Sequence, residues 1–168
     1  MKMNGKTWKY GDDIDTDVIY PGKYLVSFDP EEAAQHAMEG LESGFSKKIS
    51  PGDILVVGSN FGNGSAREQA AVALRSAGIS AVVAESFSRS FYRNAINVCL
   101  PVVELKGIHN STDEGDEVEI DLEHGLLRNL TKKTESRFSP PPPFIMEILK
   151  IGGAVAYYKQ KAQQEACV

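Results

Sequence analysis

The chain has 168 residues, enough for one domain with a substantial core, and carries a formal net charge of −5. This acidic balance argues against a nucleic-acid or membrane-surface partner. No apolar run reaches membrane-spanning length, nothing marks the chain for export, and its two cysteines, Cys99 and Cys167, fit a reducing compartment better than a disulfide scaffold. We therefore expect a cytoplasmic protein.

The N-terminal part combines a short strand, an acidic loop and a marked helix start. Residues 6–10 predict the strand, and residues 11–17 follow with four aspartates in six positions. These lack the spacing of a calcium-binding EF-hand, so capping and turn hydrogen bonds explain them better than a metal. Beyond the apolar residues 23–28, Asp29 and Pro30 predict a helix that reaches about residue 39.

The middle of the chain predicts a strand, a glycine loop, a helix and a second strand. Residues 53–58 and 79–84 are the apolar strands. Between them, residues 65–68 match the S-x-x-E capping box that begins many helices, and Gly78 is a typical helix end.

The start of this helix predicts an anionic ligand. The loop between Gly62 and Arg67 leaves the helix N-terminus open, where free amides and the helix dipole favour negative charge. Arg67 adds a planar guanidinium group that suits a carboxylate or a phosphate.

A third helix is predicted over residues 86–97, with Arg89 and Arg93 four positions apart on one side. An exposed charged face is favoured over an anion site for this pair, although its role stays open. Residues 101–105 predict a strand, and residues 106–115 predict a polar loop.

The C-terminal part predicts a β-hairpin and then a helical end. Residues 117–122 and 126–130 form the hairpin, and prolines make residues 139–143 a stiff connector. Helix then runs from residue 144 to about residue 164, interrupted at residues 152–153. Hairpin and parallel strands together predict an α/β fold.

Residues 61–68, FGNGSARE, resemble the G-S-x-R-E signature of the aconitase superfamily. Further matching pieces lie, in order, at residues 11–19, 21–25, 86–96 and 151–153. Together they resemble the stand-alone small subunits of 3-isopropylmalate dehydratase (isopropylmalate isomerase) and its homoaconitase relatives, over nearly the whole chain.

The resemblance implies a swivelling β/β/α domain with mixed sheets and packed helices, which would cover residues 1–168 as a single domain. It also implies a partner, a large subunit that carries a [4Fe–4S] cluster. The residues agree independently, because two cysteines are too few to hold such a cluster by thiolates alone. No metal or cofactor is therefore expected in this chain, and self-association of the isolated subunit is left open.

The implied reaction is dehydration and rehydration of a small hydroxy-dicarboxylic acid. In the family the serine of the signature is the base, which maps to Ser65, and Arg67 would bind a substrate carboxylate. Gly64 and Ala66 would offer backbone contacts, although the family often has a second serine at Ala66. On residues 65–68 alone a simple helix cap is the favoured interpretation, and the flanking motifs reverse that preference.

Substrate choice is expected to depend on the segment Tyr24, Leu25, Val26 and Ser27, which in the family lies by the variable group of the substrate. Val26 is apolar and offers no charge to a third carboxylate, so isopropylmalate, an intermediate of leucine biosynthesis, is favoured. Alternatives are a homoaconitase, dimethylmalate or citraconate-type hydro-lyase, Val26 as an ordinary core residue, a non-catalytic anion-binding module, and a purely structural subunit.

Overall fold

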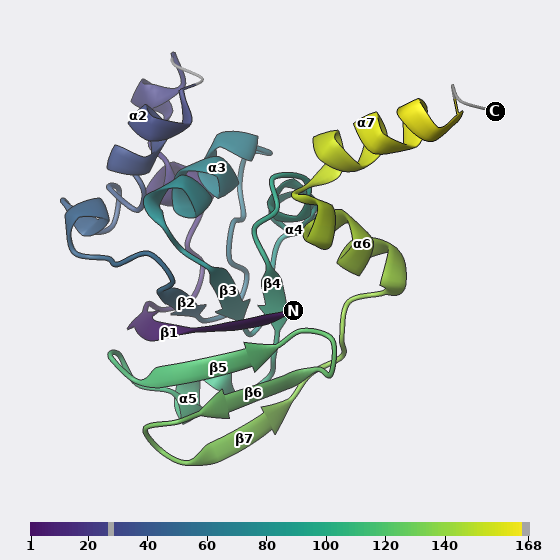
Figure 1. Ribbon diagram of the computed structural model, residues 1–168. Coiled ribbons are helices and arrows are strands. Elements are labelled where there is room, and N and C mark those ends of the chain that lie inside the picture. The colour runs from purple at the N-terminus through teal and green to yellow at the C-terminus, as the bar shows by residue number, and fades with distance from the viewer. Residues whose placement is uncertain (27–28, 166–168) are drawn as a thin grey trace.

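Seven strands form one mixed sheet in the order β4-β3-β2-β1-β5-β6-β7 (Figure 1). The computed structural model describes residues 1–26 and 29–165. The strands are β1 (Lys2–Lys9), β2 (Ile54–Val57), β3 (Ala81–Ala84), β4 (Val102–Glu104), β5 (Glu117–Asp121), β6 (Leu126–Asn129) and β7 (Thr134–Arg137). Strands β1 to β4 pair in parallel, whereas β5 pairs antiparallel with β1 and continues into β6 and β7.

The parallel half is covered on both faces. Every residue of β2 and β3 is buried, as expected where helices pack on each side of a parallel sheet. Helices α2 (Pro30–Gln35) and α3 (Glu68–Ala77) lie on one side, and the short α5 (Ile108–Ser111) lies on the other (Figure 1). The α3 face that packs inward consists mostly of alanine, which lets the helix approach the sheet closely.

The remaining helical segments are short or lie beyond the sheet: α1 (Thr16–Ile19), η1 (Gly22–Tyr24), η2 (Phe45–Lys47), α4 (Arg89–Asn97), α6 (Pro143–Ile151) and α7 (Ala154–Glu165). Gly152 and Gly153 separate α6 from α7, which confirms the predicted interruption. A Cβ placed at Gly153 would lie 2.5 Å from the carbonyl oxygen of Asn97, so glycine is needed where this junction packs on α4. From there α7 projects away from the body (Figure 1).

The α/β fold with mixed strands is confirmed, and so are the central strands and the hairpin. Helix α2 is shorter than predicted, however. It ends at Gln35 because the amide of Met38 donates to the carbonyl of Ile19 (2.7 Å), so the chain leaves the helical path. Strand β1 begins at Lys2 rather than residue 6, because its first half pairs with β5.

One further boundary and two whole elements differ from the predictions. Helix α4 begins at Arg89, because the hydroxyl of Ser88 accepts from the amide of Phe91 (3.1 Å) and caps it there. The predicted polar loop over residues 106–115 contains α5. Strand β7 was not predicted, because its four residues are polar and show no apolar alternation, and pairing with β6 alone defines it.

Candidate active site

Three loops converge at the carboxyl ends of parallel strands. The acidic loop (residues 11–17) follows β1, the glycine loop (residues 58–67) follows β2, and residues 85–88 follow β3. The carboxyl edge of a parallel sheet is where open α/β folds bind ligands. The motifs of the sequence therefore meet at the edge where a site is expected.

Backbone hydrogen bonds join the three loops into one unit. The amide of Gly62 donates to the carbonyl of Ile14 (2.8 Å), and the amide of Thr16 donates to the carbonyl of Asn63 (2.9 Å). On the other side, the amide of Phe61 donates to the carbonyl of Ser86 (3.0 Å). The glycine loop is thus held between its two neighbours.

The four aspartates of the acidic loop each have a protein partner. Asp12 accepts from the amide of Ser59 (2.6 Å), Asp13 from Asn60 Nδ2 (2.8 Å) and Asp15 from the amide of Val18 (2.8 Å). The fourth, Asp17, pairs with Arg67. The predicted capping role is confirmed for Asp15 alone, because the other three aspartates bond to the glycine loop, 47 to 50 positions away in sequence.

Close packing explains the first glycine of the loop. Gly62 has φ +73°, and a Cβ there would lie 2.3 Å from Cγ of Phe91. The ring of Phe91 in turn packs edge-on against Phe61, with 5.0 Å between centroids. The loop therefore rests directly on the aromatic side of α4.

Ser65 lies on the surface, at the end of the glycine loop. Its carbonyl accepts from Thr16 Oγ1 (2.9 Å), and its hydroxyl has no hydrogen-bond partner within residues 1–26 and 29–165. The predicted capping box is wrong: α3 begins at Glu68, and Ser65 lies two residues before the N-cap, Arg67. Contacts with the acidic loop, 49 positions away in sequence, hold Ser65 outside the helix.

The corrected helix start leaves two groups available. Arg67 has extended backbone (φ −113°, ψ 110°) and gives α3 no side-chain cap. The first amides of α3 are therefore open to an anion, and the Ser65 hydroxyl is free for another partner.

Arg67 is the charged centre of the site. Its Nη1 pairs with the carboxylate of Asp17 and donates to the carbonyl of Tyr20 at 3.5 Å. The side chain is only 18% exposed, so the guanidinium group is held against the Pro21–Gly22 turn rather than free in solvent. The hydrogen bond from Arg67 is the main reason why the pKa of Asp17 lies below its usual value. Sequence reasoning missed Asp17 as a site residue, although its motif was recognised.

The segment expected beside the substrate leaves this turn. The Tyr24 hydroxyl donates to Glu39 Oε1 (2.5 Å), and Leu25 packs partly on the core. Val26 is 88% exposed, so its interpretation as an ordinary core residue is wrong. Ser27 lies outside the described residues. Gly64 and Ala66, like Ser65, are exposed. Contact of any of these residues with a substrate stays a prediction.

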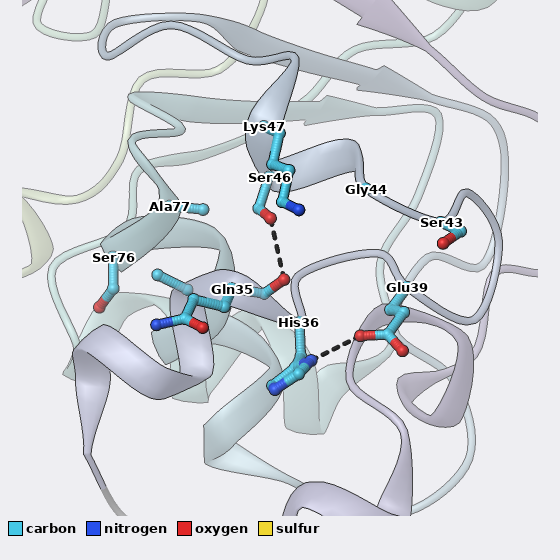
Figure 2. Close-up of a pocket in the computed structure, with 10 residues that line it drawn as sticks. Gln35, His36, Glu39, Ser43, Gly44, Ser46, Lys47, Ser76 and Ala77 are labelled. Carbon is cyan, nitrogen blue, oxygen red and sulfur yellow. Dashed lines mark hydrogen bonds and ion pairs between the residues drawn. The ribbon is translucent and has the colours of Figure 1, made fainter.

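Other candidate features lie away from this edge. Arg89 and Arg93 are exposed and line a cavity of about 300 Å³ with Phe87, Tyr92 and Glu104, which agrees with a charged face. A cavity of about 530 Å³ lies between α2, η2 and the end of α3, and Figure 2 shows its polar lining. Ser65 and Arg67 line neither cavity.

Within residues 1–26 and 29–165, no set of three or more histidine, cysteine or acidic side chains is placed to hold a metal ion. Cys99 is half-buried, its Sγ donates to the carbonyl of Leu149 (3.2 Å), and burial raises the pKa of its thiol. Cys167 lies outside the described residues. In the same ranges, no helix is long and apolar enough to cross a bilayer.

Comparisons with known proteins give one consistent result. The model of the family "Aconitase C-terminal domain" matches residues 7–107. The 3-isopropylmalate dehydratase small subunit of Thermodesulfovibrio yellowstonii is 48% identical, and the match covers 98% of both chains. The isopropylmalate/citramalate isomerase small subunit of Methanocaldococcus jannaschii is 52% identical, with 95% of both chains covered.

A solved structure agrees with these relatives. The crystal structure of 3-isopropylmalate dehydratase (leuD) from Methanocaldococcus jannaschii is 43% identical and superposes with a TM-score of 0.93, covering 99% of this chain and 98% of that one. Both the sequence identity and the fold therefore agree over nearly the full length. The chain belongs to the aconitase C-terminal domain family, among the small subunits of 3-isopropylmalate dehydratases.

Proposed function

We propose that this chain is the small subunit of a heteromeric hydro-lyase that interconverts 2-isopropylmalate and 3-isopropylmalate by dehydration and rehydration, in leucine biosynthesis. The observation that carries the proposal is the meeting of Ser65 and Arg67 at the carboxyl edge of the parallel strands, in a chain whose full-length relatives bear that name. The 168 residues would act as one swivelling domain, in the cytoplasm.

Ser65 is the proposed base. The reaction takes a proton from a carbon next to a carboxylate and removes hydroxide from the neighbouring carbon. A serine hydroxyl is ordinarily too weak an acid to be ionised at neutral pH. Here it is exposed, has no partner in the described part of the chain, and lies close to an uncapped helix N-terminus and to the charge of Arg67. Amides and charge of this kind stabilise an oxyanion once water is excluded.

Arg67 is the proposed carboxylate-binding residue. Asp17 and the carbonyl of Tyr20 both engage Nη1, so they orient the guanidinium group through one nitrogen. The Nε and Nη2 groups then present two parallel donors, the arrangement that binds a carboxylate in bidentate fashion. Asp17 is a positioning residue in this scheme.

A partner must complete the site. Ser65 and its neighbours Gly64 and Ala66 are exposed, so an active site here needs a second surface to close over it. The described residues do not suit an iron–sulfur cluster, and we assign the [4Fe–4S] cluster to the large subunit. That cluster would supply the Lewis acid that helps hydroxide leave.

Val26 supports isopropylmalate over substrates with a third carboxylate. Its side chain is apolar and exposed, on the segment that follows the turn against Arg67. An unpaired carboxylate buried beside it would be costly. The second candidate is citramalate, because the name of the Methanocaldococcus jannaschii relative includes it. Homoaconitate and dimethylmalate are less favoured.

The test is reconstitution of the chain with the large subunit encoded in the same genome. The complex should turn over 2-isopropylmalate, and citramalate less efficiently, whereas the isolated chain should be colourless and inactive. Val26→Arg should lower kcat/KM for 2-isopropylmalate by about 10- to 100-fold and raise it for homoaconitate. A reconstituted complex that leaves all malate-type acids unchanged would refute the proposal.

A further inference from the structure

Tyr24 is held by two residues that the proposed reaction does not use. Its ring stacks on the imidazole of His36, with 3.6 Å between centroids and 9° between planes. Its hydroxyl donates to Glu39 Oε1 at 2.5 Å, and Glu39 Oε2 contacts His36 Nδ1 at 2.5 Å (Figure 2 shows the latter pair). We call His36 and Glu39 the Tyr24 clamp.

We propose that the Tyr24 clamp positions the segment that selects the substrate. By holding Tyr24, the clamp fixes the positions of Leu25 and Val26 relative to Arg67. The complex then distinguishes substrates by the substrate group that contacts Val26. The inference rests on the proposed function, which it extends to two residues that do not themselves touch the substrate.

The segment needs such support because its own structure is weak. It consists of the three-residue η1 and a turn, and isolated 3₁₀ turns of this length have little intrinsic stability. Among residues 1–26 and 29–165, the amides of Tyr24 and Leu25 donate only within the turn, to the carbonyls of Pro21 (3.0 Å) and Gly22 (3.2 Å). Contacts from outside the turn, including those of the Tyr24 side chain, therefore hold the segment in place.

The clamp and the Arg67 site share one frame. Residues 36–40 are fixed to α1, since the amides of Met38 and Gly40 donate to the carbonyls of Ile19 (2.7 Å) and Val18 (3.1 Å). A Cβ at Gly40 would lie 2.7 Å from Cα of Val18, so the two backbones are in close contact. Helix α1 also carries Asp17, the partner of Arg67. The same short helix thus supports both the carboxylate-binding group and the clamp.

A third contact reinforces this arrangement. The hydroxyl of Tyr20, which is fully buried, donates to the carbonyl of Tyr24 at 3.0 Å. Tyr20 also supplies the carbonyl that faces Arg67 Nη1. Lys23 Nζ lies 3.5 Å from Glu39 Oε1 and over the Tyr24 ring. The hydrogen bonds that Glu39 makes with Tyr24 and His36, and more weakly the charge of Lys23, lower the pKa of Glu39. Val26 is left pointing outward at the end of a fixed segment.

The test uses His36→Ala, which removes the stack, and Glu39→Gln, which keeps an acceptor but removes the charge. Ser46→Ala is the matched control, because Ser46 lines the same cavity of about 530 Å³ as His36 and Glu39 but donates to the carbonyl of Gln35 (2.8 Å; Figure 2). His36→Phe should restore the stack.

The first readout is amide hydrogen exchange in the isolated subunit, which needs no activity. Exchange of the Tyr24 and Leu25 amides should be about three- to tenfold faster in His36→Ala, the range expected when one stacked aromatic pair is lost. Glu39→Gln should show a smaller increase, and Ser46→Ala none. Unchanged exchange in both clamp variants would overturn the clamp.

The second readout is the ratio of kcat/KM for 2-isopropylmalate to kcat/KM for citramalate, in the reconstituted complex. His36→Ala should lower this ratio by about tenfold, and His36→Phe should largely restore it. If amide exchange is faster but the ratio of kcat/KM values is unchanged, the clamp holds the segment in place but does not take part in substrate selection. If the wild-type complex acts on neither acid, the proposed function fails and the role in selection fails with it, while the exchange result still decides whether the clamp exists.

Discussion

The parallel and antiparallel halves of the sheet are stabilised in different ways. In the parallel half, β2 and β3 are fully buried, and the loops after β1, β2 and β3 bond to one another across 25 to 50 positions of sequence. In the antiparallel half, β5, β6 and β7 follow one another through short turns. Arg128 bridges them on the surface, to Glu119 (2.7 Å) and Glu135 (3.1 Å).

The parallel half therefore carries the proposed site, whereas the antiparallel half only extends the sheet. Exposed ion pairs contribute little stability, so the antiparallel half should tolerate substitution well. The loops of the parallel half have less freedom, because many of their polar groups bond to another loop. The match to the aconitase C-terminal domain family covers residues 7–107 and so ends before β5.

Replacing one serine in each half gives the largest expected contrast. Ser65→Ala removes the proposed base and should lower kcat of the reconstituted complex by about 10²–10⁴-fold, the usual contribution of a general base. Its stability should hardly change, because the hydroxyl has no partner in the described structure. Turnover of 2-isopropylmalate, with urea unfolding as a check on stability, measures both effects.

The control is Ser136→Ala in β7, at a partly exposed position of the antiparallel half. This change should leave kcat within a factor of two of wild type and the free energy of unfolding nearly unchanged. Full turnover by Ser65→Ala would show that Ser65 is not the base. The chain would then be a structural subunit, and the two halves of the sheet would not differ in catalytic role.

Local signals made much of both halves predictable from sequence. Gly78 ends α3 with φ +108°, the buried strands are continuous apolar runs, and the β5–β6 hairpin shows clear alternation around Gly125. Each of these signals lies within a few residues of the feature that it predicts, so a single sequence is enough to find them.

What sequence could not predict depends on contacts between distant residues. Helix α3 begins two residues later than the S-x-x-E pattern predicts, because Thr16 holds Ser65 from another loop. The same holds for the pairing of Asp17 with Arg67, which no local pattern encodes. The site residues themselves came from the resemblance to a family, and the structure adds that their motifs share one edge of the sheet.

Glycine substitutions should separate the halves by stability. Gly62→Ala places a methyl group against Phe91 at a positive φ, and we expect a loss of about 3 kcal/mol. Gly115→Ala, just before β5, also has positive φ (+82°) but no atom within 4 Å of the new Cβ, and should lose about 1 kcal/mol. Urea unfolding of both variants measures the difference. Equal losses would show that packing beneath the glycine loop does not constrain it.

Arginine-to-lysine changes test whether the planar guanidinium group matters in each half. Arg67→Lys should raise KM for 2-isopropylmalate by about tenfold and lower kcat less, because a lysine cannot bind a carboxylate through two parallel donors. Arg128→Lys should leave both constants unchanged. Steady-state kinetics of the reconstituted complexes decides. If Arg67→Lys leaves KM unchanged, Arg67 does not bind the substrate carboxylate.

The smallest expected effect concerns acid stability in the antiparallel half. Glu123, in the turn after β5, lies 2.8 Å from the Met1 amino group and 2.8 Å from Lys150 Nζ, and these two cations lower its pKa to about 2. The pKa of a glutamate in the unfolded chain is higher, about 4.5. The pair therefore contributes its full stabilisation above that value and loses it as the pH falls toward 2.

Glu123→Gln should accordingly lower Tm slightly at pH 7, and the difference from wild type should shrink between about pH 5 and pH 2. Because both cations and the carboxylate are exposed to solvent, 0.5 M salt should also reduce the difference at pH 7. Thermal unfolding monitored by circular dichroism across this range measures it, and KM of the complex at pH 7 should not change. A Tm difference that stays constant down to pH 2 would mean that the ion pairs of Glu123 do not stabilise this half.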